Sequence, residues 1–269
     1  MEGPTYRILH PTDLTTASHA AFVHALRLAL AKRAKITLLH ASDGDEAPEW
    51  GEFPGVRETL HQWGLLPAEA HHRDVAGLGI AVRKLISSFS DPVEACLSHL
   101  ADHPADLIVL AHGTGRPVGT VSTPLSRRSG LPTLFLPAGS KGFVEALTGK
   151  VRLARVLLPV ASSPSPEGAV AQLAELLSAL EVEAEITVLH VGEGDVLPSL
   201  TLPEGKGLRW VTRTLQGEVI PTLVAASQGH DLVVMPTDGR SGLVEMLRGS
   251  HTERVLRSVR CPLLALPVQ

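Results

Sequence analysis

Aromatic and basic residues are both scarce in this chain, which argues against the usual ways of binding nucleic acid. Only 3% of the 269 residues are aromatic, and 24 lysines and arginines stand against 28 aspartates and glutamates, a net charge of −4. Proteins that bind nucleic acid carry an excess or a stripe of positive charge, and those that hold single strands stack bases on aromatic rings. We therefore expect no nucleic-acid partner.

Cysteines and long apolar segments are also rare or missing. The two cysteines, Cys96 and Cys261, lie in apolar patterns in different halves of the chain, so they form no disulfide framework and fit a reducing compartment. No run of about 18 apolar residues occurs, and the N-terminus lacks a signal-peptide pattern. These observations predict a cytoplasmic protein without membrane contact.

What the chain does contain is an internal repeat. Four short apolar segments of the first half recur in the same order in the second half. The matching pairs are 6–11 with 154–159, 35–40 with 185–190, 105–110 with 230–235, and 131–137 with 261–267. Such a repeat indicates duplication of a unit of about 120–140 residues. We predict two domains, at 1–142 and 150–269.

The repeated segments have the pattern of buried strands. Each is a short apolar run bounded by polar or turn residues, as in a parallel sheet covered on both faces. Helical patterns separate them, such as the apolar stripe Val170, Leu173 and Leu177. This alternation predicts an α/β fold in which each half is a doubly wound parallel sheet. Segments 42–67 and 192–207 are predicted to be surface loops, and 143–147 a short linking helix.

Ligands of such sheets bind beyond the carboxyl ends of the strands, where the winding reverses. In the second half Gly249-Ser250 stands before an apparent helix with Val255, Leu256 and Val259 on one face. Glycine allows close approach of a ligand, and the backbone N–H groups at a helix N-terminus suit a phosphate. The alternative is that these glycines only make turns.

The strand order and this loop resemble the universal stress protein family, over essentially the whole chain as two copies. The resemblance implies tandem domains with the adenine nucleotide alpha hydrolase-like fold. Nucleotide-binding members carry Gly-x2-Gly-x9-Gly-[Ser/Thr], and Gly239 followed by nine residues and Gly249-Ser250 matches its last three elements. Pro236 stands where the family has its first glycine. This is a departure, because proline lacks an N–H and has a fixed φ.

The first half keeps a different part of the family pattern. Asp13 matches the acidic residue that the family places after its first strand to contact the nucleoside, whereas Ala161 stands there in the second half. Gly119 and Thr120 match the end of the phosphate loop, but only three residues separate Gly115 from Gly119. The loop of the second half is nearly complete and that of the first is degenerate, so we place the nucleotide in the second half.

The resemblance implies a set of nucleotide-binding residues, in which Val160 and Val191 flank the adenine and Gly249 and Ser250 hold the phosphates. The full set is Val160, Val191, Pro236, Gly239, Arg240, Gly249, Ser250 and His251 in the second half, with Asp13, Ala41, Gly119 and Thr120 in the first. The implied ligand is ATP or another adenine nucleotide, with Mg²⁺ as an accompanying ion.

Three functions stay open. The first is a regulatory stress-response protein that binds an adenine nucleotide and is not an enzyme, although slow ATP hydrolysis is left open. Neither a Gly-x-Ser-x-Gly elbow nor a phosphate loop ending in Gly-Lys-[Ser/Thr] occurs in the sequence. The second is an interaction module whose two nucleotide sites are both degenerate. The third is an adenylating or nucleotide-transferring enzyme, against which the lack of a lysine or an acidic pair near the loop counts.

Histidines at the predicted strand ends offer a metal-binding alternative. His10, His40 and His112 would emerge near Asp13, and three imidazoles with a carboxylate resemble a zinc donor set. Histidines at strand ends more often bond to backbone groups or water, so we predict no metal and keep these three as the alternative ligands.

Each half ends in an apolar segment, 133–136 and 263–266, that would form the edge of its sheet. Because exposed sheet edges are normally covered, we predict that the two halves pair through these strands as an intramolecular pseudo-dimer. A further homodimer is left open.

Overall fold

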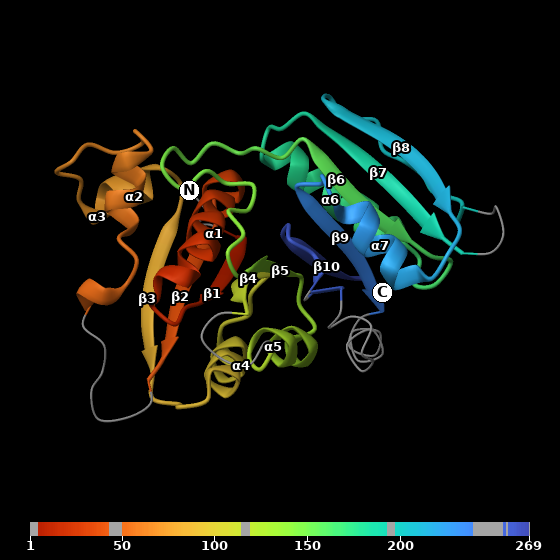
Figure 1. Ribbon diagram of the computed structural model, residues 1–269. Helices are drawn as coiled ribbons and strands as arrows, with labels where there is room; N and C mark the ends of the chain where they lie inside the picture. The colour runs from red at the N-terminus through yellow and green to blue at the C-terminus, as the bar shows by residue number, and fades with distance from the viewer. Residues whose placement is uncertain are drawn as a thin grey trace.

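The computed structural model describes residues 5–42, 50–113, 119–192, 197–238, 255–256 and 258–268. Within these ranges ten strands form one sheet in the order β3-β2-β1-β4-β5-β10-β9-β6-β7-β8 (Figure 1). The strands of the first half are β1 (Arg7–Pro11), β2 (Lys35–Ala41), β3 (Ala81–Ser87), β4 (Leu107–His112) and β5 (Thr133–Pro137). Those of the second are β6 (Arg155–Val160), β7 (Ala184–Val191), β8 (Leu208–Leu215), β9 (Leu232–Asp238) and β10 (Leu263–Val268).

Neighbouring strands within each half are parallel, and the halves meet at an antiparallel pair. β5 and β10 pair with Leu134 opposite Leu264 and Phe135 opposite Leu263. Both halves follow the same order from edge to joint, 3-2-1-4-5 in one and 8-7-6-9-10 in the other. The predicted α/β fold is confirmed, and the final strands pair as the sequence indicates. The domain limits 1–142 and 150–269, the pseudo-dimer as a whole and a further homodimer stay predictions.

Helices cover both faces of the sheet. Those whose full extent lies within the described ranges are α1 (His19–Lys32), α2 (Val56–Gln62), α3 (His72–Gly77), α4 (Pro92–Asp102), α5 (Ser122–Ser129), α6 (Glu167–Ala179) and α7 (Val219–Ser227), with the short 3-10 turns η1 (Thr16–Ser18) and η2 (Trp50–Glu52). Within the described ranges, none of these helices has both the length and the apolar character needed to cross a bilayer.

Two apolar cores fill the space between sheet and helices, and each runs through both halves. Phe22 of α1 and Leu173 of α6 belong to the first, which we call the α1/α6 core. Cys96 of α4, Leu125 of α5 and Leu223 of α7 belong to the second, the α4/α5/α7 core. Because strands covered on both faces bury every side chain, their sequences are continuous apolar runs instead of alternating ones.

The duplication is also visible in matching contacts at the amino ends of the strands. The Asp106 carboxylate accepts a hydrogen bond from the Arg7 backbone N–H at 2.8 Å. In the second half Asp231 accepts from the Arg155 N–H at the same distance, 2.8 Å. Asp106 therefore joins the start of β4 to the start of β1, and Asp231 joins the start of β9 to the start of β6.

The start of α4 is fixed by a side-chain cap. Asp91 accepts from the Val93 and Glu94 N–H groups at 2.7 and 3.0 Å, and Pro92 occupies the first helical position. Both features satisfy or remove N–H groups that the helix itself leaves unpaired.

Replacing Asp91 with alanine is expected to lower the free energy of unfolding by about 1 kcal/mol. The matched control is Glu94→Ala, which removes only a carboxylate paired with the exposed Arg128 and is expected to cost at most about 0.5 kcal/mol. Urea unfolding of both variants makes the comparison, and equal losses would contradict the capping role.

The expectation that segment 42–67 is only a surface loop is wrong. Segment 42–67 contains α2, whose Val56 and Leu60 are buried, as well as η2; residues 43–49 lie outside the described ranges. This short helix was missed because seven residues give too little periodicity to recognise against polar neighbours. Segment 197–207 does lack helix and strand, as predicted.

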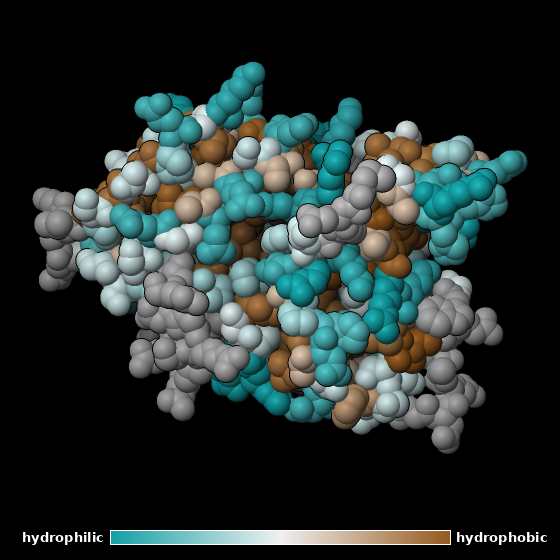
Figure 2. All heavy atoms as spheres, turned by 180° about the vertical axis from the view of Figure 1, so that it is seen from behind, coloured by the Kyte–Doolittle hydropathy of each residue, from teal (hydrophilic) through white to brown (hydrophobic). Residues whose placement is uncertain are grey.

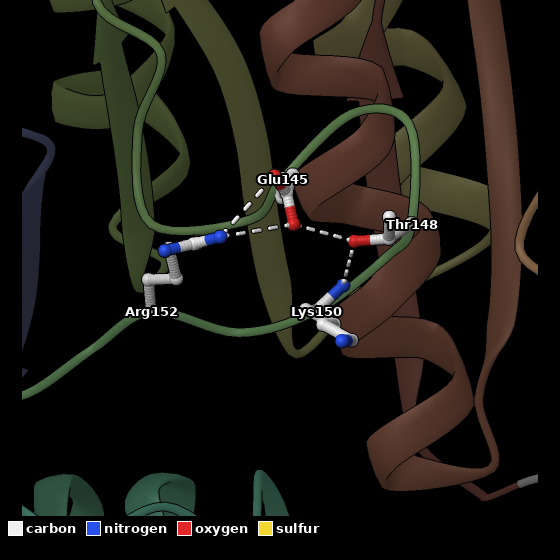
Figure 3. Close-up of polar contacts among 4 residues, drawn as sticks. All are labelled: Glu145, Thr148, Lys150 and Arg152. Carbon is white, nitrogen blue, oxygen red and sulfur yellow. Dashed lines mark hydrogen bonds and ion pairs between the residues drawn. The ribbon is translucent and has the colours of Figure 1, made fainter.

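The linker between the halves is a hairpin and not a helix. Val144 and Val151 form an isolated antiparallel bridge, and the Glu145 N–H donates to the Lys150 carbonyl at 2.9 Å. At its tip the Glu145 carboxylate accepts from Thr148 Oγ1 at 2.7 Å and from the Arg152 guanidinium at 3.3 Å (Figure 3). We call residues 143–152 the linker hairpin.

Seen from behind, hydrophilic side chains are spread widely over the surface with smaller apolar areas between them (Figure 2). Among the described residues, the exposed large apolar side chains are Leu65, Phe89, Leu147, Leu215 and Val219.

Candidate functional site

The strand order creates one winding reversal in each half. β1 pairs with β2 on one side and β4 on the other, and β6 likewise pairs with β7 and β9. Connections on the two sides of such a strand leave in opposite directions, which opens a crevice at the carboxyl ends. The candidate sites are therefore the ends of β1 and β4 and the ends of β6 and β9 (Figure 1).

In the second half, the two valines predicted to flank the adenine lie at the ends of adjacent strands. Val160 ends β6, is 6% exposed and packs into the α1/α6 core. Val191 ends β7, is partly buried and packs against the α4/α5/α7 core. A single ligand that touches both must lie across the end of the sheet and not on one of its faces.

The end of β9 carries the other described residues of this site. Pro236 is partly buried, and Thr237 beside it is 1% exposed. The Thr237 hydroxyl has no hydrogen-bond partner among the described residues. Val255, Leu256 and Val259, predicted to share a face, are all buried in the α4/α5/α7 core. The predicted phosphate-binding residues Gly239, Arg240, Gly249, Ser250 and His251 lie outside the described ranges.

In the first half, Asp13 is exposed just beyond β1 and shapes its own turn. Its Oδ1 accepts from the Thr15 N–H at 3.1 Å, from Thr15 Oγ1 at 2.8 Å and from Ser18 Oγ. Leu14 between them has φ 61°, in the left-handed region that side chains other than glycine seldom adopt. The carboxylate thus stabilises the strained turn that leads into α1, at the position predicted to contact a nucleoside.

The end of β4 is tied to the first turn of α5 by a buried side-chain pair. His112 Nδ1 lies 2.7 Å from Ser122 Oγ, and both residues are 4% exposed. Gly113 and Gly119 have φ 86° and 88°, so the backbone turns there through conformations that favour glycine. Gly119 and Thr120 precede α5 as predicted, and residues 114–118 lie outside the described ranges.

Ser122 was not singled out from the sequence, although the repeat offered a signal. It follows Gly119 by three residues, as Thr252 follows Gly249. A serine next to a histidine is the start of a nucleophilic pair, but this pair is buried and so gives a substrate no access. Its role in the described structure is to join β4 to α5.

The strand-end histidines bond to protein groups. His10 Nδ1 lies 2.8 Å from the Val109 carbonyl, and burial lowers the pKa of His10 to about 4. His40 Nδ1 lies 2.9 Å from the Thr12 carbonyl, and the equivalent His190 Nδ1 lies 3.2 Å from that of Val160. The expectation of backbone bonding is confirmed for these residues.

The metal-binding alternative finds no support in the described geometry. His10, His40 and His112 direct Nδ1 to three different partners. Among the residues that the structure describes, no group of three or more histidine, cysteine, aspartate or glutamate side chains is placed to hold a metal ion.

Ala41, predicted to border the nucleotide in the first half, ends β2 partly buried against the α4/α5/α7 core. It therefore occupies the position that Val191 holds in the second half, since each follows the matching histidine of its own strand, His40 or His190. The two halves present the same backbone frame at their carboxyl ends, with different side chains on it.

Comparison with known proteins identifies the family. The model of the universal stress protein family matches residues 5–137 and 199–267. The chain belongs to the universal stress protein family. A curated universal stress protein of Methanocaldococcus jannaschii is 36% identical over 67 residues, which are 24% of this chain and 39% of that relative. The match spans well under half of the relative's length, so it supports kinship and not a shared activity.

Solved structures show the same fold over nearly the whole chain. A universal stress protein from Archaeoglobus fulgidus superposes with a TM-score of 0.59 at 17% identity, covering 97% of this chain and 96% of its own. A functionally unknown protein from Pseudomonas aeruginosa gives a TM-score of 0.61 at 14% identity, covering 97% and 92%. At these identities the likeness concerns the fold alone.

Proposed function

We propose that this universal stress protein binds an adenine nucleotide at the carboxyl ends of β6 and β9, as a cytoplasmic regulatory protein and not as an enzyme. One observation carries the proposal. β9 ends at Asp238, so the segment with Gly239 and Gly249-Ser250 begins where β9 leaves the sheet at the winding reversal. Beyond that segment, Val255 and Leu256 are helical and buried. The family motif thus spans the strand-to-helix connection where a phosphate is expected in this fold.

Each residue has a role in the proposed complex. The N–H groups of Gly249 and Ser250 and the Ser250 hydroxyl hold phosphate oxygens, and Arg240 adds positive charge. Val160 and Val191 border the base across the end of the sheet. Mg²⁺ accompanies ATP by binding to its phosphates.

Calorimetric titration with ATP, ADP and AMP, with and without Mg²⁺, tests the proposal. Ser250→Asp and Gly249→Asp are each expected to weaken binding about 100-fold. The added carboxylate repels the phosphate and displaces hydrogen bonds to a charged group, which are worth about 1.5–3 kcal/mol. The matched control is Thr120→Asp at the equivalent position of the first half, which is expected to leave the affinity unchanged. A larger loss for Thr120→Asp than for Ser250→Asp would move the site to the first half.

The second candidate is an interaction module in which both nucleotide sites are degenerate. The observation in its favour is that Asp13 bonds within its own turn and His112 bonds to Ser122. These residues of the first half therefore form hydrogen bonds within the protein. Absence of both binding heat and thermal stabilisation with every nucleotide would refute nucleotide binding and favour this candidate.

A further inference from the structure

A buried histidine of the first half holds the linker between the halves. His24 lies in α1 and is 0% exposed. Its Nε2 accepts two backbone hydrogen bonds from the linker hairpin, from the Phe143 N–H at 2.9 Å and the Val144 N–H at 3.1 Å. The imidazole also meets the Phe143 ring edge to face, with centroids 4.5 Å apart. The linker is thus bonded to one side chain that lies more than a hundred residues earlier in the chain.

This geometry fixes the protonation state of His24. Nε2 faces two N–H donors, so it must present its lone pair and carry no proton. Nδ1 lies 2.7 Å from the Ala20 carbonyl and therefore carries the proton of the neutral ring. A second proton, on Nε2, would face two N–H groups and remove both acceptor bonds at once. The contact exists only with the neutral imidazole.

The hairpin is fitted closely around this contact. Gly142 has φ 66°, and a Cβ added there would lie 2.2 Å from His24 Cε1. Further along, Trp63 donates from Nε1 to the Ala146 carbonyl at 2.9 Å, and a Cβ on Gly149 would lie 2.5 Å from its ring. Two glycines therefore let the hairpin approach α1 and Trp63, and the segment continues through the buried Leu153 into β6.

Few charges surround the imidazole. Along the sequence of α1 and the linker, the ionisable residues near the contact are Arg27, three residues after His24, and Lys141 and Glu145, on either side of Phe143 and Val144. On the sheet side, Leu136 of β5 packs at Gly142 and is apolar, and His10 of β1 is neutral because of its own burial. Burial lowers the pKa of His24 to about 4, opposed by the bond to the Ala20 carbonyl. The ring is neutral at neutral pH.

We propose that His24 is a proton-operated latch, in which uptake of one proton from solvent at Nε2 breaks both bonds to the linker hairpin and frees it from α1. The pairing of β5 with β10 contains no titrating side chain, so the sheet joint does not take part in this step. Acid thus changes the link between the halves before it changes the sheet.

Amide hydrogen exchange of the full-length protein, followed by NMR between pH 6.5 and 4, tests the latch. The protection factors of the Phe143 and Val144 amides are expected to fall by up to tenfold per pH unit, and about 80-fold in total, because opening is coupled to one proton between the open-state and latched pKa values of His24. The amides of Leu134 and Leu264, at the joint, are expected to keep higher protection factors than the hairpin amides at each pH, because they exchange only when the whole protein unfolds.

Matched variants separate the latch from general acid unfolding. In His24→Gln the amide oxygen replaces Nε2 as an acceptor that does not titrate, so the hairpin amides should lose their pH dependence. In Gly142→Ala the added methyl should hold the latch open, with low protection at every pH. In His10→Asn the hairpin should respond as in the wild type, because the other buried histidine is removed and His24 is kept. The latch is refuted if hairpin protection is independent of pH in the wild type, if it is equally dependent in His24→Gln, or if the hairpin and joint amides have equal protection factors at every pH.

Discussion

Acidification from pH 7 to pH 4 is expected to lower the free energy of unfolding by about 6 kcal/mol, about 3 kcal/mol from each of two buried histidines. Burial lowers the pKa of both His10 and His24 from 6.5 to about 4. In the unfolded chain each ring takes up a proton as the pH falls below about 6.5, whereas in the folded chain it stays neutral down to about pH 4. Between these limits the unfolded state binds more protons, so acid favours unfolding.

The same comparison gives the pH range over which the free energy of unfolding changes. Above about pH 6.5 both states hold neutral rings, so the stability that these residues contribute is fully present and does not vary. It is lost as the pH falls towards 4 and the loss is complete below that value. A loss of this size is a large part of the stability of an ordinary domain, about 5–15 kcal/mol.

Urea unfolding at pH 7, 6, 5 and 4 measures this effect. His10→Asn, which still offers an N–H to the Val109 carbonyl, and His24→Gln should each remove about half of the pH dependence, and the double variant most of it. A wild-type stability that stays constant from pH 7 to pH 4 would show that the two rings are charged or exposed in the folded protein.

Phe135→Ala is expected to lower the free energy of unfolding by about 3–5 kcal/mol and to destabilise both halves together. Phe135 is 1% exposed, stands opposite Leu263 across the joint of β5 and β10, and meets the His112 ring edge to face at 6.0 Å. Truncation leaves a cavity in the α4/α5/α7 core, which contains residues of both halves. A joint that is part of a shared core transmits the loss to both sides.

Two tryptophans make this test specific to each half. Trp63 lies against the linker hairpin in the first half, and Trp210 lies on β8 in the second, donating to the Pro203 carbonyl at 3.0 Å. Versions of the protein in which Trp63 or Trp210 is the only tryptophan, with Trp50 replaced as well, should unfold at the same urea concentration, and Phe135→Ala should shift both equally. The control is Leu147→Ala, since Leu147 is 66% exposed and its removal should change stability by less than about 0.5 kcal/mol. A shift of the Trp63 transition alone would show that the halves unfold separately.

Much of the fold was predictable because it depends on short runs of residues that are adjacent in the sequence. The four repeated apolar runs correspond to β1, β2, β4 and β5 and to their counterparts in the second half. A strand buried on both faces must be apolar throughout, so such runs stand out against polar connections. β3 and β8 were not predicted as strands. They form the two outer edges of the sheet, where most residues are only partly buried or exposed and the pattern is accordingly weaker.

The candidate site was predictable in its place and less so in its contacts. The sequence located the carboxyl ends of the strands and the glycines that follow them, because a turn residue after an apolar run is a local signal. It also placed Asp13 beside the end of β1. It did not indicate that Asp13 closes its own turn, that His112 bonds to Ser122, or that Val160 and Val191 pack on opposite faces of the sheet.

The sequence by itself determined the duplication, the α/β class and the positions of most strands, since each depends on residues close together in the chain. Only the tertiary structure decided which distant groups the linker between the halves contacts. The bonds from the linker hairpin to His24 span 119 and 120 residues, and those of Trp63 and Ala146 span 83. Helical or strand periodicity reports which face of an element is buried but not which distant group it meets. The partners of a buried polar side chain are therefore fixed only when the chain has folded.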